Sequence, residues 1–188
     1  MRRWCRIGFA AVLGIVCSAC SVTRHIPQGS YFLQKVKIED DRSAPRKERI
    51  TASELEKYIR QTPNKRFLGT NFYVWLYEQA NPDRENRWNE WKRKIGEEPV
   101  LLDQSLTQKS AENLKVYMDS KGFFNSRATF RIDTTSRRRR ATVIYTTHQG
   151  EPYRIDSISY RFHDKFLEQI VLPDTAQTLL RRGDIYDV

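Results

Sequence analysis

Residues 113–132 of the chain, NLKVYMDSKGFFNSRATFRI, change their hydrophobic period halfway along. Leu114, Tyr117 and Met118 follow the i, i+3, i+4 spacing that places side chains on one face of a helix. The lysine–glycine pair that ends at Gly122 is a typical helix end, because lysine complements the helix dipole and glycine readily adopts the left-handed conformation. Beyond it apolar and polar residues alternate, which is the period of a strand. The stretch therefore predicts a helix followed by a strand.

Alternation continues on both sides of a short arginine-rich connection. Ala128, Phe130 and Ile132 share one side of the first predicted strand, and residues 141–147 form a second alternating run. Two such runs separated by a few residues predict an antiparallel pair, against which the helix can bury its apolar face. We expect an α+β protein built around this unit.

A strand and a helix are predicted ahead of this unit. Residues 31–39 alternate apolar and lysine side chains, and Thr51 with Glu54 fits a capping box at a helix start. The helical spacing continues to about Pro63, and Ser105 begins a second capping box ahead of the long helix. The predicted order is strand, helix, helix, strand, strand.

The segment between the two predicted helices, residues 63–103, is irregular and includes Trp88 and Trp91. Two tryptophans three residues apart pack in most cases against a neighbouring element, so the favoured interpretation is a flap that covers the core. A ligand or membrane contact made by the tryptophans is the alternative.

The first twenty residues indicate export. A positively charged start is followed by an apolar run at residues 7–16, which is too short to span a bilayer and is typical of a cleavable signal peptide. Small residues precede Cys20, as in a bacterial lipoprotein signal, where the cysteine becomes the acylated N-terminus. The alternative is that Cys20 is an ordinary thiol. Because the three cysteines lie at positions 5, 17 and 20, neither a disulfide nor a thiolate metal site is expected beyond residue 20.

The chain carries a formal net charge of +10. Such a charge can attract nucleic acid, anionic lipid or acidic protein segments. Its densest cluster is a basic patch in the predicted hairpin connection, formed by Arg137, Arg138, Arg139 and Arg140. The patch can bind phosphate, or it is the solvated tip of the hairpin. Nucleic acid is not expected as a partner, because the chain is exported and the aromatic spacing of a nucleic-acid-binding sheet is missing.

The sequence contains no convincing catalytic constellation. His25, His148 and His163 lie far apart and lack the spacing of a metal site. No glycine-rich phosphate loop follows a predicted strand, and no nucleophile elbow surrounds a serine. We expect neither an enzyme nor a cofactor.

A weak internal repeat of the first predicted strand begins after Gly150. Tyr153, Ile158 and Tyr160 have the same spacing as three apolar residues in 31–39. The expected organisation is a signal peptide, a tether, one complete module with an insertion, and the start of a second module. Their residues are 1–19, 20–30, 31–149 with the insertion 63–103, and 150–188.

The predicted order of elements resembles a POTRA module, the periplasmic unit of BamA/TamA-type outer-membrane proteins. Three short motifs strengthen the resemblance: KGFF at 121–124, GEPYRI at 150–155 and GDIY at 183–186. With Cys20 and residues 26–38, the chain is similar to the N-terminal part of the TamA-like lipoproteins of Bacteroidetes, often called TamL. The long insertion departs from a minimal POTRA unit and resembles that lipoprotein branch.

This resemblance implies a role in inserting or translocating outer-membrane and surface proteins. The expected partners are outer-membrane protein clients or components of the assembly machinery, and the expected location is the periplasmic side of the outer membrane, with a lipid anchor at Cys20. Intact family members carry several POTRA modules followed by a C-terminal β-barrel. Because the chain ends inside the second predicted module, we expect a fragment without the barrel.

The expected mechanism is strand addition, in which an extended segment pairs with an open sheet edge. The candidate edge comprises Phe124, Arg127, Thr129 and Arg131, and residues 31–39 could supply an edge instead. The alternative is a structural lipoprotein scaffold that docks a partner through its basic face. Salt separates the two, since binding through the arginines should weaken steeply with ionic strength.

Overall fold

The computed structural model describes residues 26–81, 84, 86–135, 139–174 and 179–187. Its elements are β1 (Phe32–Asp40), α2 (Ala52–Leu55), the 3-10 turn η2 (Glu56–Tyr58), α3 (Phe72–Glu78), α4 (Arg87–Ile95), α5 (Gln104–Ser120), β2 (Arg127–Thr135), β3 (Arg140–His148) and α6 (Lys165–Asp174). The prediction of an α+β protein is confirmed. The expected signal peptide and Cys20 lie outside the described residues, as do Arg137 and Arg138 of the basic patch.

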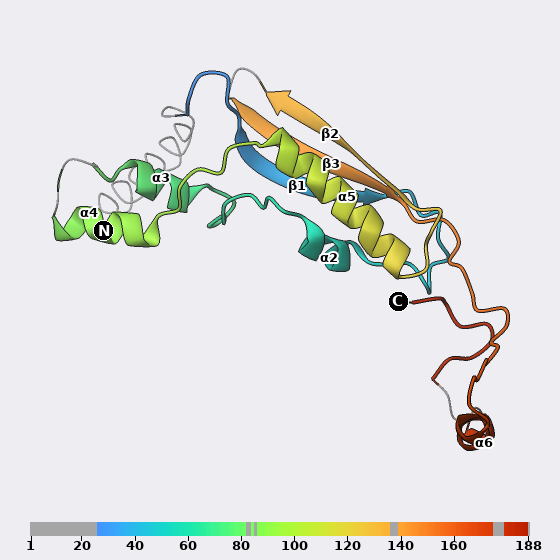
Figure 1. The fold of residues 1–188 in the computed structure, drawn as a ribbon. Helices are drawn as coiled ribbons and strands as arrows, with labels where there is room; N and C mark the ends of the chain where they lie inside the picture. Colours follow the sequence, from blue (N-terminus) through green and yellow to red (C-terminus); the bar gives the residue numbers. More distant parts are fainter. Residues whose placement is uncertain (1–25, 82–83, 85, 136–138, 175–178, 188) are drawn as a thin grey trace, which may run out of the picture. The chain divides into compact units, whose positions relative to one another are not determined.

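The strands form one mixed sheet in the order β1-β3-β2, with β3 in the middle (Figure 1). Four residues join β2 to β3, so this pair is antiparallel, as the sequence predicts. The pair β1 and β3 is parallel, because Phe32 N donates to Arg139 O at 2.9 Å and Asp41 N donates to Thr147 O at 3.1 Å. The central position explains why most of β3 is buried, including Val143, Ile144 and Tyr145.

The chain divides into two compact units that each take residues from several stretches of sequence. Unit one comprises the residues up to Lys37 with Ile59–Ser110 and Phe130–Tyr145, and unit two comprises Ile38–Tyr58, Ala111–Thr129 and Thr146–Val188. All three strands and α5 contribute residues to both units.

Unit one contains an apolar core formed by Ile26, Phe32 and Val74, against which Trp75 and Leu101 pack. The first half of α5 is joined to β3, since Tyr145 Oη donates to Thr107 O at 3.4 Å. Burial of residues on this face of α5 agrees with the helical spacing found in the sequence.

The cap of α5 differs from the expected capping box at Ser105. The carboxylate of Asp103 accepts from Ser105 N at 2.8 Å and from Leu106 N at 3.1 Å. Asp103 therefore caps the helix, and Ser105 lies inside its first turn. An aspartate at this position satisfies two amide groups and also complements the positive end of the helix dipole.

A buried glutamine, which no sequence pattern indicates, links two stretches of unit two. Gln149 is fully buried, and its amide accepts from Ile50 N and donates to Ile50 O, both at 2.9 Å. The side chain thus pairs with the backbone of Ile50 on both sides, as a neighbouring strand would. The expected capping box follows directly, with Thr51 N donating to Glu54 Oε2 at 3.0 Å.

The helix that follows this cap is shorter than the sequence predicts. Helical spacing extends to about Pro63, whereas α2 ends at Leu55 and the 3-10 turn ends at Tyr58. Side chains from α5 satisfy the backbone at this point: Asn113 Nδ2 donates to Tyr58 O at 3.3 Å, and Ser110 Oγ accepts from Arg60 N at 2.9 Å. These tertiary hydrogen bonds replace further turns of helix.

Gly122 ends α5 in the left-handed conformation, with φ of +85°, as predicted. Its carbonyl accepts from Tyr153 N at 2.8 Å, and Tyr153 O accepts from Tyr186 N at 2.9 Å. The segment that repeats the spacing of residues 31–39 does not form a strand. Among the described residues it makes one isolated bridge, between Arg154 and Ile185, and a further hydrogen bond from Gly183 N to Ile155 O at 2.8 Å. A strand needs a continuous partner, and a single bridge does not provide one.

Replacing Gly122 by alanine should destabilise unit two by about 3 kcal/mol, because a Cβ there is strained at positive φ and also collides with the backbone of the C-terminal segment. The added Cβ would lie 2.6 Å from Tyr186 O. Urea unfolding measures the loss.

Gly183→Ala is the matched control for this substitution. Gly183 also belongs to unit two and has φ of +92°, but a Cβ there meets nothing within 4 Å. Gly183→Ala should therefore lower the free energy of unfolding only by the backbone strain, about 1 kcal/mol. Equal losses in the two variants would show that the contact with Tyr186 contributes nothing.

Candidate partner-binding edge

β2 lies at one edge of the sheet, with β3 on one side and no strand of the described sheet on the other. Side chains alternate along it: Arg127, Thr129 and Arg131 are exposed, whereas Ala128 and Phe130 are half-buried. Alternation arises because successive side chains of a strand point to opposite faces. The three exposed residues belong to the candidate edge predicted from the sequence, and the structure brings them onto one face of β2.

Phe124, the fourth residue of the candidate edge, is not part of β2. It lies in the turn between Gly122 and Ser126, in which Ser126 N donates to Phe123 O at 2.9 Å. Its ring packs against Tyr153 and Tyr186, with centroid distances of 5.3 and 5.8 Å. The apolar residues before the strand therefore anchor the C-terminal segment instead of extending the edge.

The opposite edge belongs to β1, and the chain itself covers its beginning. Leu33 N donates to Val100 O, and Tyr31 O accepts from Leu102 N, both at 2.8 Å. Further along β1, Lys35 and Lys37 are exposed. Lysines on an edge discourage pairing with other chains. β2 contains neither lysine nor proline, but Arg127, Arg131 and Asp133 are charged and exposed. Of the two edges considered in the sequence analysis, β2 is the less protected.

The described half of the basic patch is tied into unit one. Arg139 donates from Nη1 to Ile26 O at 2.7 Å, and its own carbonyl accepts from Phe32 N at 2.9 Å. Arg140 is the first residue of β3, and both side chains are half-buried. The contacts of Arg139 join the end of the hairpin to the start of β1.

The titratable groups in the described part of the chain include no cluster that could hold a metal ion. No group of three or more histidine, cysteine or acidic residues gathers there. His148 pairs with Asp41. Burial opposes ionisation of Asp41, but hydrogen bonds from His148 and Ser43 outweigh it and hold the pKa of this carboxyl below its usual value.

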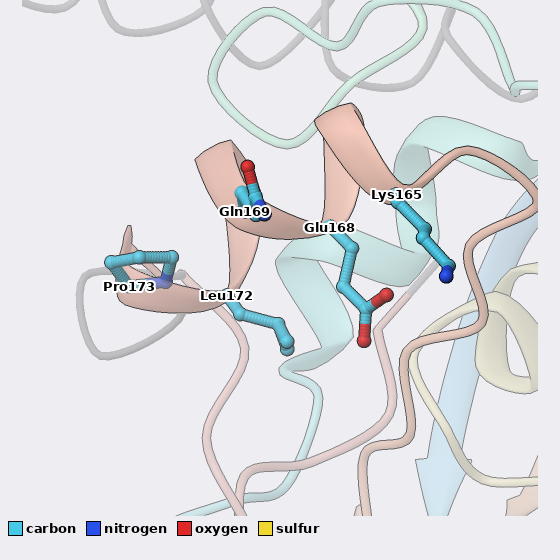
Figure 2. A pocket seen from close by; sticks show the side chains of 5 residues that line it. All are labelled: Lys165, Glu168, Gln169, Leu172 and Pro173. Atoms are coloured by element: carbon cyan, nitrogen blue, oxygen red, sulfur yellow. The ribbon is translucent and has the colours of Figure 1, made fainter.

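Figure 2 shows an open pocket beside α6, lined by Lys165, Glu168, Gln169, Leu172 and Pro173. All five residues come from one helix, and Lys165 and Glu168 extend toward the same side of it. Ligand sites are usually enclosed and use polar groups that converge from several elements. This pocket lacks both properties and is not a candidate site.

Within the described ranges, no helix has the length and apolar character needed to cross a bilayer.

Comparison with known proteins gives one structural similarity. No model of a known protein family matches the chain, and no curated protein matches it. The crystal structure of Haemophilus influenzae BamA POTRA3-5 is similar, with 12% sequence identity, coverage of 87% of this chain and 83% of that chain, and a TM-score of 0.31.

Glu78 in α3 makes the stability of unit one depend on pH. Burial raises its pKa to about 7 from 4.5, and Oε1 has no hydrogen-bond partner among the described residues. A raised pKa means that the folded state holds the proton more tightly than the unfolded state does. The stabilisation is complete below pH 4.5 and is lost as the pH rises to about 7.

Glu78→Gln should remove this loss and raise the unfolding free energy above neutral pH by about 1 kcal/mol, a figure reduced for partial solvent screening. Urea unfolding at several pH values measures the effect. The matched control is Glu90→Gln, which changes an exposed glutamate of α4 and should leave the pH profile unaltered. A wild-type profile that is flat between pH 4.5 and 7 would contradict the assignment.

Proposed function

We propose that this chain is a POTRA-type binding module of an outer-membrane protein assembly or translocation factor, and that β2 binds extended segments by strand addition. The observation that carries the proposal is the position of β2: a nine-residue strand at the edge of a mixed sheet, with neither lysine nor proline. An edge of this kind offers a template of backbone donors and acceptors.

Backbone pairing fits a module that must handle many clients. Hydrogen bonds to N–H and C=O groups tolerate most side chains, since each residue of a client other than proline carries the same backbone groups. Side chains that alternate along the client would meet the exposed row of Arg127, Thr129 and Arg131 on one face only. We expect modest selectivity for alternating segments, the pattern of a membrane β-strand.

The motifs behind the family resemblance also support the proposal. The KGFF motif at 121–124 supplies Gly122 and Phe124, and the segments 150–155 and 183–186 supply Tyr153 and Tyr186, which contact them. The three short motifs thus contact one another in a single cluster in unit two. No catalytic role is proposed for this chain.

Photo-crosslinking tests the strand-addition site. A photoactivatable residue is placed at Thr129 of β2, at Lys35 of β1 or at Lys109 on the exposed side of α5. The probe is a synthetic peptide with alternating polar and apolar residues. We expect crosslinks from Thr129, because an added strand lies beside β2, and few from Lys35 or Lys109.

The control peptide has the same sequence with every backbone amide methylated, which removes the backbone donors on both of its edges. It should crosslink weakly, and binding of the parent peptide should change little with salt. Equal crosslinking by both peptides, or crosslinks chiefly from Lys35, would exclude β2 as the site. A steep loss of binding with salt would favour the basic-face scaffold instead.

The lipid anchor is proposed from the sequence, since Cys20 lies outside the described residues. Mass spectrometry of the chain expressed in a bacterium should show an acylated N-terminal Cys20. Cys20→Ala should move the protein from the membrane fraction to the soluble fraction, because acyl chains contribute about 0.8 kcal/mol per buried methylene. A product that retains Met1 would contradict the anchor.

A further inference from the structure

Helix α4 presents an apolar face to solvent. Trp88 is 71% exposed, Trp91 46% and Ile95 39%. Their spacing of i, i+3 and i+7 places them on one side of the helix. The two indole rings contact each other edge to face, with centroids 6.0 Å apart, and they border a hollow together with Asn86 and Arg87. The prediction that these two tryptophans belong to a flap covering the core is therefore wrong.

The one residue of α4 that is buried is polar. Asn89 is buried and donates to Arg84 O at 2.9 Å, and its backbone N donates to Asn86 Oδ1 at 2.8 Å. At the end of the helix, Gly96 approaches α3 so closely that a Cβ would lie 2.6 Å from Tyr77 N. These contacts fix the orientation of α4 within unit one and keep the tryptophans outside.

Cations surround this apolar face. The nine residues of α4 include Arg87, Lys92, Arg93 and Lys94, and their one carboxylate is Glu90. Lys92 and Arg93 donate to the backbone carbonyls of Gln79 and Asn81, which are neutral acceptors. Apolar side chains and positive charge therefore occupy the same short helix.

This combination matches the surface of an anionic membrane. Indole rings favour the headgroup region, because they combine an apolar body with an N–H donor. Cations next to them are attracted by anionic lipid, and a helix of nine residues is too short to span the bilayer. An apolar groove on a protein would accommodate the tryptophans but would not require the cations.

We propose that α4 binds the surface of a bilayer that contains anionic lipid, with Trp88, Trp91 and Ile95 in the headgroup region and the basic residues against the phosphates. This contact is independent of the proposed strand addition and of acylation at Cys20. It would hold unit one at a membrane surface and define which side of it is turned toward the lipid.

Vesicle flotation of the processed chain, which begins at residue 20, tests the proposal. Cys20→Ala in every variant removes the acyl chains, and the missing signal peptide removes the apolar run at residues 7–16. The vesicles contain phosphatidylethanolamine with phosphatidylglycerol, or phosphatidylcholine alone. Trp88→Ala/Trp91→Ala should weaken binding to the anionic vesicles about tenfold or more. Arg87→Gln/Lys94→Gln, which changes two exposed cations, should weaken it about thirtyfold at low salt and have little effect on phosphatidylcholine.

The matched control is Phe166→Ala, which removes a 68% exposed aromatic ring from α6. Lys165 and Glu168 neighbour this ring, so α6 lacks the excess positive charge of α4. Binding should be unchanged in this variant. Circular dichroism shows whether each variant is folded, and crosslinking from Thr129 should persist in the tryptophan variant, which separates this test from that of the proposed function.

A second readout is indole fluorescence with brominated phosphatidylglycerol as the quencher. Quenching should occur in the parent chain and fall to the background of Trp75 in Trp88→Ala/Trp91→Ala. Three outcomes would overturn the proposal: binding that survives loss of both tryptophans, equal loss in Phe166→Ala, or binding to a single-stranded oligonucleotide and not to vesicles.

Discussion

The fold depends on the parallel pairing of β1 with β3, which joins the first strand to the last across both predicted helices and the insertion. Hydrogen bonds from Phe32 N to Arg139 O and from Asp41 N to Thr147 O mark its two ends, one in each unit. Because β3 is central, its two sides are occupied by β1 and β2. The apolar side chains of β3 can therefore be buried, and the outer strands become the two edges.

The two edges differ in how they are protected. The start of β1 is covered, because Leu33 N donates to Val100 O and Leu102 N donates to Tyr31 O. Further along the strand, Lys35 and Lys37 are exposed. β2 has no such cover among the described residues and alternates polar and apolar side chains along nine residues. Natural sheets usually blunt an edge with charged residues, lysine above all, with proline or with a covering segment. β2 carries charged residues but neither lysine nor proline, and no strand of the described sheet lies beyond it, so it is the more accessible edge for a partner strand.

Helix α4 inverts the usual arrangement of a surface helix, which buries its apolar side and exposes its polar side. Here Asn89 is buried with both of its polar contacts satisfied, while Trp88 and Trp91 are exposed. Satisfied hydrogen bonds make a buried asparagine tolerable, and close approach at Gly96 holds the helix against α3. These exposed tryptophans on a constrained helix are the basis of the membrane contact that we propose.

Local patterns in the sequence determined the helix ending at Gly122, the alternating strands, the capping box at Thr51 and the α+β class, because each depends on neighbours a few residues apart. Other features depend on contacts between residues far apart in sequence, and only the tertiary structure decided these. Gln149 pairs with Ile50, α5 side chains end the helix after Thr51, and Phe124 packs on Tyr153 instead of extending β2. The tertiary structure also decided that Trp88 faces solvent. Periodicity marks an apolar face of a helix, but it does not show whether another element covers that face.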